Sequence, residues 1–383
     1  MLAAGAERFG GLSGDHVSSG GIPARIRAWG LPPRVLGVDV ARGLAVIGMF
    51  AAHVAVQVPF DWSPHTWSGL SDGKPSVLFA LLAGVSIAIL SRRDGSGQAI
   101  AVRAAIVYVL GLLLMLLPTN VAVILPSYGA LFLLALPFRR ADPRKLAVAA
   151  AVLAVVAPAL VLPLREQLGD APAAARLLLL DPLITGYYPA LIWIAYVLAG
   201  IAIGRLDLLN PRVAVALVAV GGVLAGTGYG LGAALEGTVA REPWVVLFTA
   251  EPHSDTPFDV IGTGGTAIAV LGLCLLLSRM LRGGARWLLL PLGAVGAMAL
   301  TAYTAQLIAI AARGIPVPGD DPSNTAFWVL TLVTVAGCCA WVLLVGRGPL
   351  EAAMHAATHT DSGGDAAGRL NGAVGPGGNR EQP

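Results

Sequence analysis

Residues 37–58 read GVDVARGLAVIGMFAAHVAVQV, an apolar run with only two charged side chains, Asp39 and Arg42. A run of about 17–25 apolar residues is long enough to cross a bilayer as a helix. Further runs of this kind follow along the chain, at roughly 75–91, 101–118, 120–138, 146–164, 187–204, 212–234, 260–278, 288–312 and 325–345. The sequence therefore predicts an all-α membrane protein, a polytopic bundle of about ten transmembrane helices.

The composition of the 383-residue chain also indicates a membrane protein. Hydrophobic residues make up 56% and charged residues 12% of the chain, whereas a soluble domain usually has about 25% charged residues. Helix surfaces that face lipid need no charge, so a bilayer explains the difference. The net charge of +3 is not gathered in a basic stripe, so we expect no nucleic-acid partner. Arg greatly outnumbers Lys, which together with abundant Ala, Gly and Val favours a GC-rich bacterial source.

The distribution of charge predicts how the helices are oriented, because cytoplasmic loops collect Arg and Lys. With the N-terminus inside, the inner connections hold most of the cations: Arg92, Arg93, Arg139, Arg140, Arg144, Lys145, Arg205, Arg212, Arg279, Arg282, Arg286 and Arg347. The outer connections collect acids instead: Asp61, Asp72, Glu166, Asp170, Glu236, Glu242, Glu251, Asp255, Asp320 and Asp321. We therefore expect both termini in the cytoplasm and the protein in the cell (plasma) membrane.

Both ends of the chain differ from its apolar middle. Residues 1–33 are rich in Gly, and the residues from 360 onward are rich in Gly, Asp, Asn and Arg. Segments without apolar periodicity cannot bury enough surface to fold. We expect disordered cytoplasmic tails at 1–33 and 352–383 around one transmembrane domain at 34–351.

The cysteines and histidines do not follow a zinc pattern. Cys274, Cys338 and Cys339 lie inside apolar runs, where they are expected to be buried like other small apolar side chains. Histidines at the outer face, combined with Asp61 or Asp255, would be alternative metal ligands, but their spacing fits no zinc site. We therefore expect no metal.

Asp39 and Arg42 stand out because ionisable groups inside a membrane span are costly and usually face the protein interior. Their i, i+3 spacing places them on one face of the helix. Three interpretations remain open at this point. The pair forms a local ion pair, Arg42 extends its side chain to the membrane interface, or Arg42 binds an anionic group such as the phosphates of a cytoplasmic donor.

Three histidines fall at the outer face in this topology. His53 lies late in the first run, His65 follows in the string Asp61-Trp-Ser-Pro-His-Thr-Trp67, and His253 lies in a long outer loop. Imidazole titrates near neutral pH and is the usual general base in enzymes. The alternative for each is a solvated or hydrogen-bonded loop histidine without a catalytic role.

Several motifs resemble those of a known family. They are RVLGVDVARGLAVIGMFAAH at 34–53, PHTWSGLSD at 64–72, SVLFALLAGVS at 76–86, PLGAVGAMALTAYTAQ at 291–306 and GRGPLE at 346–351. The first two resemble the transmembrane acyltransferase superfamily, which includes heparan-alpha-glucosaminide N-acetyltransferase. The last three resemble its bacterial YeiB-like branch. The resemblance therefore covers residues 34–351.

The resemblance implies an acyltransferase that takes an acetyl or other acyl group from cytoplasmic acyl-CoA. The acceptor would be a hydroxyl or amine of a glycan or glycolipid at the outer face, and we allow for a homodimer. His65 matches the family's loop histidine that mediates transfer, and His53 stands where the family has Asn. The remaining candidates would bind donor or acceptor: Arg42, Asp39, Trp62, Trp67, Asp72, His253 and Gln306.

Two other functions remain open. A transporter or flippase of a small anionic or lipid-linked compound needs polar groups at mid-membrane depth, and the predicted spans offer few beyond tyrosines, Thr301 and Gln306. The functional polarity gathers at the two interfaces instead, which favours acyl transfer. The third interpretation, a membrane sensor or scaffold, lacks a tail long enough for a signalling domain.

Overall fold

The computed structural model describes residues 35–58, 63–92, 96–168, 171–236, 247–315 and 323–359, and these residues form helices and loops without a strand. In chain order the elements are α2 (Leu36–Val54), η1 (Pro64–Ser71), α3 (Lys74–Leu90), α4 (Ser96–Leu114), α5 (Leu125–Ala135), η2 (Leu136–Phe138), α6 (Pro143–Gln167), α7 (Ala173–Ala175), η3 (Arg176–Thr185), α8 (Ala190–Gly204), α9 (Pro211–Leu235), α10 (Pro257–Met280), η5 (Gly283–Leu289), α11 (Leu290–Ala297), α12 (Ala299–Arg313), α13 (Thr325–Leu344) and α14 (Pro349–His359). η1, η2 and η5 are 3₁₀ helices and η3 is a π-helix.

The predicted fold class, an all-α polytopic membrane protein, is confirmed, and the described residues hold fewer full-length spans than the expected ten. Seven helices are long and apolar enough to cross a membrane, and two further helix pairs, bent by 52° and 73° at short breaks, raise the number to nine. The predicted run 120–138 contains only a shorter apolar helix, Leu125–Phe138. The chain between α4 and α5 is not helical beyond a turn, so less of that run remains for a span.

The expected tails are only partly within the described residues. Residues 1–33 and 360–383 lie outside them, so the prediction of disorder is untested there. Residues 352–359 were expected to be disordered, and this is corrected: they continue α14 to His359. Met354 of this helix packs against the hydrophobic core, which gives the segment an apolar contact that holds it in place.

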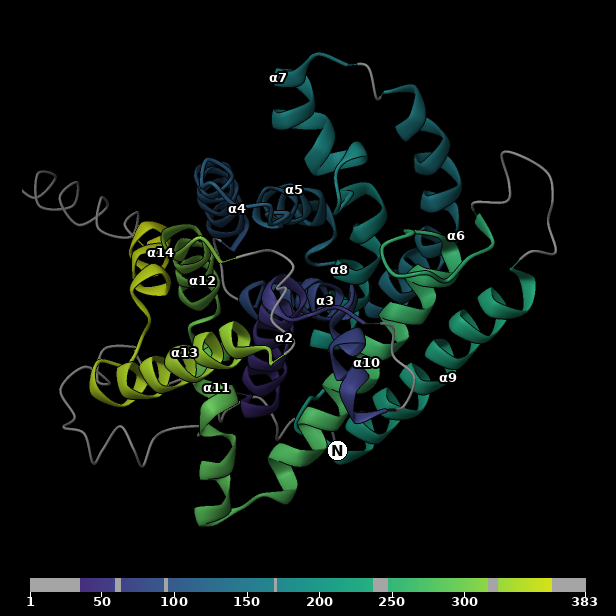
Figure 1. Cartoon of the computed structure of the whole chain (residues 1–383). Coiled ribbons are helices and arrows are strands. Elements are labelled where there is room, and N and C mark those ends of the chain that lie inside the picture. The colour runs from purple at the N-terminus through teal and green to yellow at the C-terminus, as the bar shows by residue number, and fades with distance from the viewer. Residues whose placement is uncertain are drawn as a thin grey trace, which may run out of the picture.

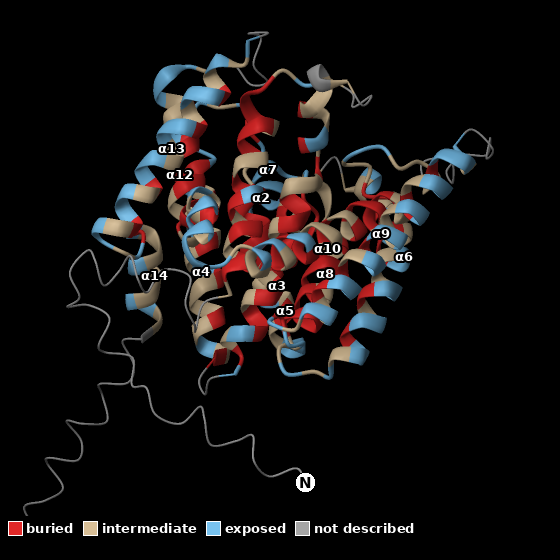
Figure 2. Ribbon diagram, turned by 90° about the horizontal axis from the view of Figure 1, so that it is seen from below, coloured by how far each residue is buried: buried red, intermediate tan, exposed pale blue. Residues whose placement is uncertain are grey.

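The helices divide into a central group and an outer group. Figure 1 shows α2, α3, α8 and α10 in the middle, with α6 and α9 on one side and α12, α13 and α14 on the other. Of the most apolar part of each helix, 67% is buried in α2 and 61% in α10, compared with 22% in both α9 and α13. Figure 2 shows the same division, with buried residues concentrated in the centre. The exposed large hydrophobic side chains of α9 and α13 are Val, Leu and Trp, and most of their other exposed residues are Ala or Gly, which suits lipid-facing helices.

Local sequence signals fix where three of the long helices begin. Asp142, Asn210 and Thr256 each precede a Pro at the first position of α6, α9 and α10. Each side-chain oxygen accepts a hydrogen bond from a backbone N–H in the first turn, at 2.9–3.1 Å. Polar caps followed by Pro are favoured because they satisfy or remove N–H groups that lack a partner inside the helix.

Glycines let the central helices touch. A methyl group at Gly84 of α3 would overlap the carbonyl oxygen of Val197 in α8, and one at Gly200 of α8 would overlap that of Leu81 in α3. Small residues allow this close approach between membrane helices. The α3–α8 contact therefore depends on the absence of side chains at both positions.

Gly84→Ala is expected to lower the free energy of unfolding by about 1–3 kcal/mol, because the added methyl group overfills a closed contact. Gly222→Ala in α9 is the matched control, since a Cβ there meets no heavy atom within 4 Å. Ala at that position gains up to about 1 kcal/mol of helix propensity. Thermal unfolding of the purified variants in detergent measures both effects, and equal melting of G84A and the parent would contradict the close contact.

The predicted span 288–312 is not one continuous helix. α11 and α12 meet at the bend of 73°. The backbone N–H groups of Leu300 and Thr301, which open the new helix, donate to Oε1 of Glu351 in α14 at 2.9 and 3.1 Å. A carboxylate is favoured at this end of a helix because the helix dipole is positive there. The apolar run gives no sign of the break, since the acceptor lies 51 residues further along the chain.

At one end of the bundle, arginines of the expected inner loops bind carbonyl groups at helix ends. Arg92 Nη2 donates to the carbonyl oxygen of Gly204 at the end of α8 (3.2 Å), and Arg205 donates to that of Arg139 after η2. The last carbonyls of a helix lack partners inside the helix, so cationic side chains stabilise them. Segments expected on the same side of the membrane thus meet in space.

Candidate functional site

Arg42 ties three helices together near the end of the bundle that is expected to face the cytoplasm. Its guanidinium forms an ion pair with Asp39 one turn earlier in α2 (3.0 Å). It also donates to Ser86 Oγ in α3 at 3.0 Å and to the carbonyl oxygen of Gly296 in α11 at 3.3 Å. Of the interpretations left open by the sequence, the local ion pair is present. A guanidinium has five N–H donors, so these contacts leave donors that an added anion can use.

A cavity of about 260 Å³ lies beside Arg42, between α2, α3, α4, α5, α11, α12 and α14. Charged and polar side chains line part of it, namely Arg42, Ser86, Arg103 and Glu351. The rest of the lining is mostly apolar or aromatic: Met49, Phe79, Ala83, Val107, Ile124, Leu125, Tyr128, Phe132, Gly296, Ala297, Ala299, Leu300, Tyr303 and Met354. Along α2 the lining extends from Arg42 to Met49, roughly 10 Å into the bundle.

His53 lies in the last turn of α2, one aromatic ring away from this cavity. Its imidazole is buried, and the centroid of the Tyr303 ring, which lines the cavity, is 6.3 Å from that of His53. Gln306 Nε2 lies 3.0 Å from His53 Nδ1. The structure therefore brings together His53 and Gln306, which the sequence singled out separately. Neither lines the cavity that contains Arg42.

The loop that contains His65 is only partly described. His65 lies in the first turn of η1, and its side chain is outside the described residues, as is all of Trp62. Trp67 packs against Phe327 and Trp328 of α13, with ring centroids 5.1 and 5.8 Å apart. The indole of Trp67, a predicted binding residue, is therefore already in contact with aromatic side chains of the protein itself.

His253 meets Asp72 at the end of the bundle opposite Arg42. His253 Nε2 lies 3.6 Å from Asp72 Oδ1, and its ring centroid lies 4.2 Å from that of Tyr187. Burial lowers the pKa of His253, and Lys74 adds to this, while Asp72 opposes it. A neutral imidazole at pH 7 follows. The sequence left open whether His253 joins the other candidates, and the structure places it against one of them.

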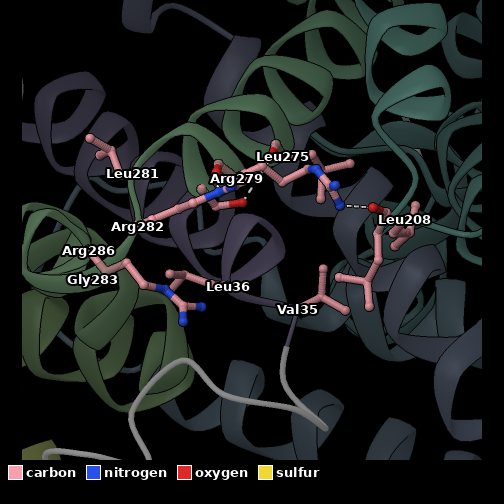
Figure 3. A pocket seen from close by; sticks show the side chains of 11 residues that line it. Val35, Leu36, Leu208, Leu275, Arg279, Leu281, Arg282, Gly283 and Arg286 are labelled. Carbon is pink, nitrogen blue, oxygen red and sulfur yellow. Dashed lines mark hydrogen bonds between the residues drawn. The ribbon is translucent and has the colours of Figure 1, made fainter.

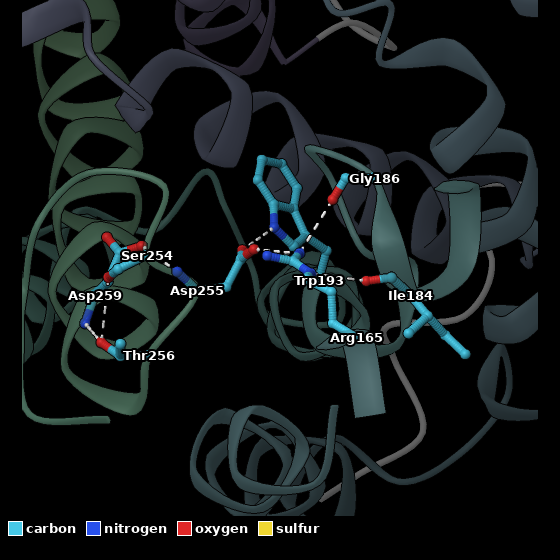
Figure 4. Close-up of polar contacts among 8 residues, drawn as sticks. All are labelled: Arg165, Ile184, Gly186, Trp193, Ser254, Asp255, Thr256 and Asp259. Carbon is cyan, nitrogen blue, oxygen red and sulfur yellow. Dashed lines mark hydrogen bonds and ion pairs between the residues drawn. The ribbon is translucent and has the colours of Figure 1, made fainter. Parts of the chain in front are cut away.

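A buried carboxylate beside His253 was not assigned a role in binding or catalysis from the sequence. Figure 4 shows Asp255 between Arg165 and Trp193. Its carboxylate is 5% exposed, forms an ion pair with Arg165 (3.0 Å) and accepts a hydrogen bond from Trp193 Nε1 (3.0 Å). Burial raises the pKa of the Asp255 carboxyl, and the contacts with Trp193 and Arg165 oppose that rise. No sequence signal pairs these residues, because they come from α6, α8 and the loop before α10.

Asp255→Ala is expected to lower the free energy of unfolding by about 2–4 kcal/mol, since it leaves Arg165 and Trp193 without their acceptor. Breaking a fully buried pair costs about 3–5 kcal/mol, and the 28% exposure of Arg165 reduces that cost. Asp255→Asn keeps an acceptor for Trp193 and is expected to lose less. Glu166→Ala, which removes an exposed carboxylate beside Arg165, should stay within about 0.5 kcal/mol. Unfolding in detergent measures all three variants, and equal loss in D255A and E166A would contradict the role of the pair.

Metal chemistry finds no support in the described part of the chain, where no group of three or more His, Cys, Asp or Glu side chains could hold a metal ion. Cys274 and Cys338 are buried, as the apolar runs predicted, whereas Cys339 is only half-buried.

Residues 34–221 match the family model of heparan-alpha-glucosaminide N-acetyltransferase, catalytic. The predicted resemblance to this enzyme's catalytic region is thereby confirmed over those residues. The match includes Arg42, His53, His65 and Asp72, and it ends before Gln306. No curated protein matches the chain. The resemblance to the YeiB-like branch stays a prediction that rests on the motifs.

Proposed function

From the resemblance of residues 34–221 to a membrane acetyltransferase, we propose that this protein moves an acyl group across the bilayer. The donor is a cytoplasmic acyl-CoA, most simply acetyl-CoA. The acceptor is a hydroxyl or amine of a glycan or glycolipid at the outer face. The observation that carries the proposal is the cavity that extends from the arginines at the expected inner end toward Tyr303, which contacts His53.

The cavity suits the narrow arm of an acyl-CoA better than the whole molecule. Its volume of about 260 Å³ is below the roughly 300–1,000 Å³ of sites that enclose an entire drug-sized ligand. The nucleotide would stay at the mouth, where Arg42 and Arg103 offer N–H donors to phosphate oxygens. Glu351 also lines the cavity, but its carboxylate accepts three hydrogen bonds from Leu300 and Thr301. The apolar walls would hold the thioester end.

Gln306 determines what His53 can do. With the Gln306 amide nitrogen facing His53 Nδ1, Nδ1 would accept the hydrogen bond and the imidazole proton would lie on Nε2. His53 does not line the cavity, so the acyl end would have to pass the Tyr303 ring before the His53 N–H group could stabilise the negative charge on its carbonyl oxygen. The amide of Asn is also a hydrogen-bond donor, so His53 would replace the family's Asn in function.

In the proposed reaction His65 acts as general base. It takes the proton from the acceptor hydroxyl or amine, whose oxygen or nitrogen then attacks the thioester carbonyl carbon. The carbon–sulfur bond breaks, and the departing coenzyme A sulfur takes up the proton. No further reagent is needed, because the acyl group leaves one heteroatom and joins another.

The acceptor would bind at the outer end, near η1 and the loop before α10. Tyr187 is 53% exposed and its ring is tilted against that of His253, so one ring at this end is open to a sugar. Asp72 is half exposed and offers a carboxylate to hydroxyl groups. The test is whether the purified protein in lipid nanodiscs releases coenzyme A thiol from acetyl-CoA when membrane glycolipids are added. Absence of release with every acceptor fraction would overturn the proposal.

A transporter or flippase remains the second candidate, and the broken spans favour it. Transporters often build their sites at discontinuous helices, and this chain has pairs of helices bent by 52° and 73°. A transporter would move an anionic or lipid-linked compound in liposomes without consuming acetyl-CoA. Thiol release together with acylated acceptor would exclude this candidate.

A further inference from the structure

A second pocket lies at the end of the bundle expected to face the cytoplasm. Its volume is about 280 Å³, and it is formed by the start of α2, the end of α10, the segment leading into η5 and the connection between α8 and α9. Figure 3 shows Arg279, Arg282 and Arg286 around this pocket, with Val35 and Leu36 across from them.

Three arginines within eight residues of chain line this pocket. Arg279 lies in the last turn of α10 and donates to the carbonyl oxygen of Leu209, while Arg282 Nε donates to the carbonyl oxygen of Arg279 at 3.3 Å. Arg286 follows in η5. Among the described residues that line the pocket there is no acidic side chain. Three cationic side chains around one pocket attract an anion.

The rest of the pocket is apolar. Its other lining residues are mostly aliphatic: Val35, Leu36, Leu208, Leu209, Leu275 and Leu281. A pocket lined by both cationic and aliphatic side chains suits a ligand in which an anionic group is joined to an apolar or lipid-like part. Basic pockets between membrane helices on the cytoplasmic side commonly bind phosphate-containing headgroups.

This pocket is separate from the cavity beside Arg42. The two share no lining residue. Between them, α11 packs directly on α2, since a methyl group at Gly43 would overlap the carbonyl oxygen of Leu292, and one at Gly296 would overlap that of Asp39. A ligand bound here would therefore not occupy the proposed path of the acyl group.

We propose that this pocket binds a phosphate group, with Arg279, Arg282 and Arg286 as its cationic ligands. Two sources carry that chemistry at this face. One is the headgroup of an anionic phospholipid of the inner leaflet, and the other is the phosphates of coenzyme A. The aliphatic side chains that line the pocket favour the phospholipid. The inference goes beyond the proposed acyl transfer, because a lipid site here needs no catalysis.

Equilibrium binding to the purified full-length protein tests the proposal. The probes are dihexanoyl phosphatidylglycerol, dihexanoyl phosphatidylcholine and free coenzyme A, titrated separately. The variant is Arg282→Gln/Arg286→Gln, and its matched control is Arg144→Gln/Lys145→Gln, which removes two exposed cations at the start of α6. Each lost cation near the membrane surface weakens binding of an anionic lipid by about fivefold. The pocket variant should therefore raise the dissociation constant for phosphatidylglycerol by roughly ten- to thirty-fold, and the control by less than about twofold.

The probes separate the sources. Weaker phosphatidylglycerol binding with unchanged coenzyme A binding assigns the pocket to a lipid headgroup, and the reverse assigns it to the donor's phosphates. Unchanged binding of both probes, or equal weakening in the control, would overturn the proposal. If the double variant does not fold, Arg282→Gln alone removes an exposed side chain and should still cost about fivefold. Because the readout is binding, a failure of acyl transfer would leave this result intact.

Discussion

Replacing His65 by Ala is expected to lower the rate of acyl transfer by about 10²–10⁴-fold, the usual contribution of a positioned general base. The acceptor hydroxyl or amine would then have to lose its proton to water. Coenzyme A release and acylated acceptor, measured together in nanodiscs, give the rate. The loss should appear in turnover rather than in binding of acetyl-CoA, because the donor cavity lies against α2 rather than η1.

The control is another histidine, His16→Ala, in the tail that the sequence predicts, and it should leave the rate within about twofold. Thermal unfolding should be the same for H65A, H16A and the parent, since His65 lies in a short 3₁₀ helix at the end of the bundle. Parent-like turnover by H65A would remove the general base from the mechanism, and the acyltransfer proposal would then need a different residue in that role.

His53→Leu is the second large effect, with an expected loss of about 10²–10³-fold in turnover. Leu keeps the apolar packing at the end of α2 but removes the N–H group that would stabilise the developing oxyanion. His53→Asn restores a donor at the same place, so it should recover most of the rate, to within about tenfold of the parent. The measurement is the rate at saturating acetyl-CoA.

Substituting Gln306 in the parent and in the His53→Asn variant tests whether His53 acts chemically or only structurally. Gln306→Leu removes the hydrogen bond to His53 Nδ1, so it should slow the parent by about tenfold and have little effect in the His53→Asn background. Independent effects in the two backgrounds would show that Gln306 does not act through His53, because distant, uncoupled changes add. A variant H53N as slow as H53L would contradict the role as hydrogen-bond donor.

The sequence predicted the class of fold well because lipid imposes a simple rule on it. Each long apolar run has to form a helix, since backbone groups have no partners in hydrocarbon. The break near residues 186–189 falls at the start of the predicted run 187–204, whereas the break near residue 298 escaped prediction because the chain stays apolar through it. At the second break, Glu351 accepts a hydrogen bond from the backbone N–H of Leu300. No local sequence pattern reveals this contact.

The sequence named individual candidate residues for the site, but it did not predict which of them contact each other. His53 and Gln306 were both candidates, but their contact spans 253 positions and depends on how α12 packs beside α2. His253 and Asp72 likewise meet only once η1 and the loop before α10 are folded. Arg165 and Trp193 carried no motif at all, and their importance comes from the buried carboxylate that they share.

The carboxylate at the α11–α12 break has a consequence for biosynthesis. As the polypeptide leaves the ribosome, the amides of Leu300 enter the membrane 51 residues ahead of the side chain that satisfies them. Until α14 has been translated, the first turn of α12 has to take its partners from water or lipid headgroups. The nascent chain therefore reaches its final arrangement at this break only after Glu351 of α14 has been synthesised.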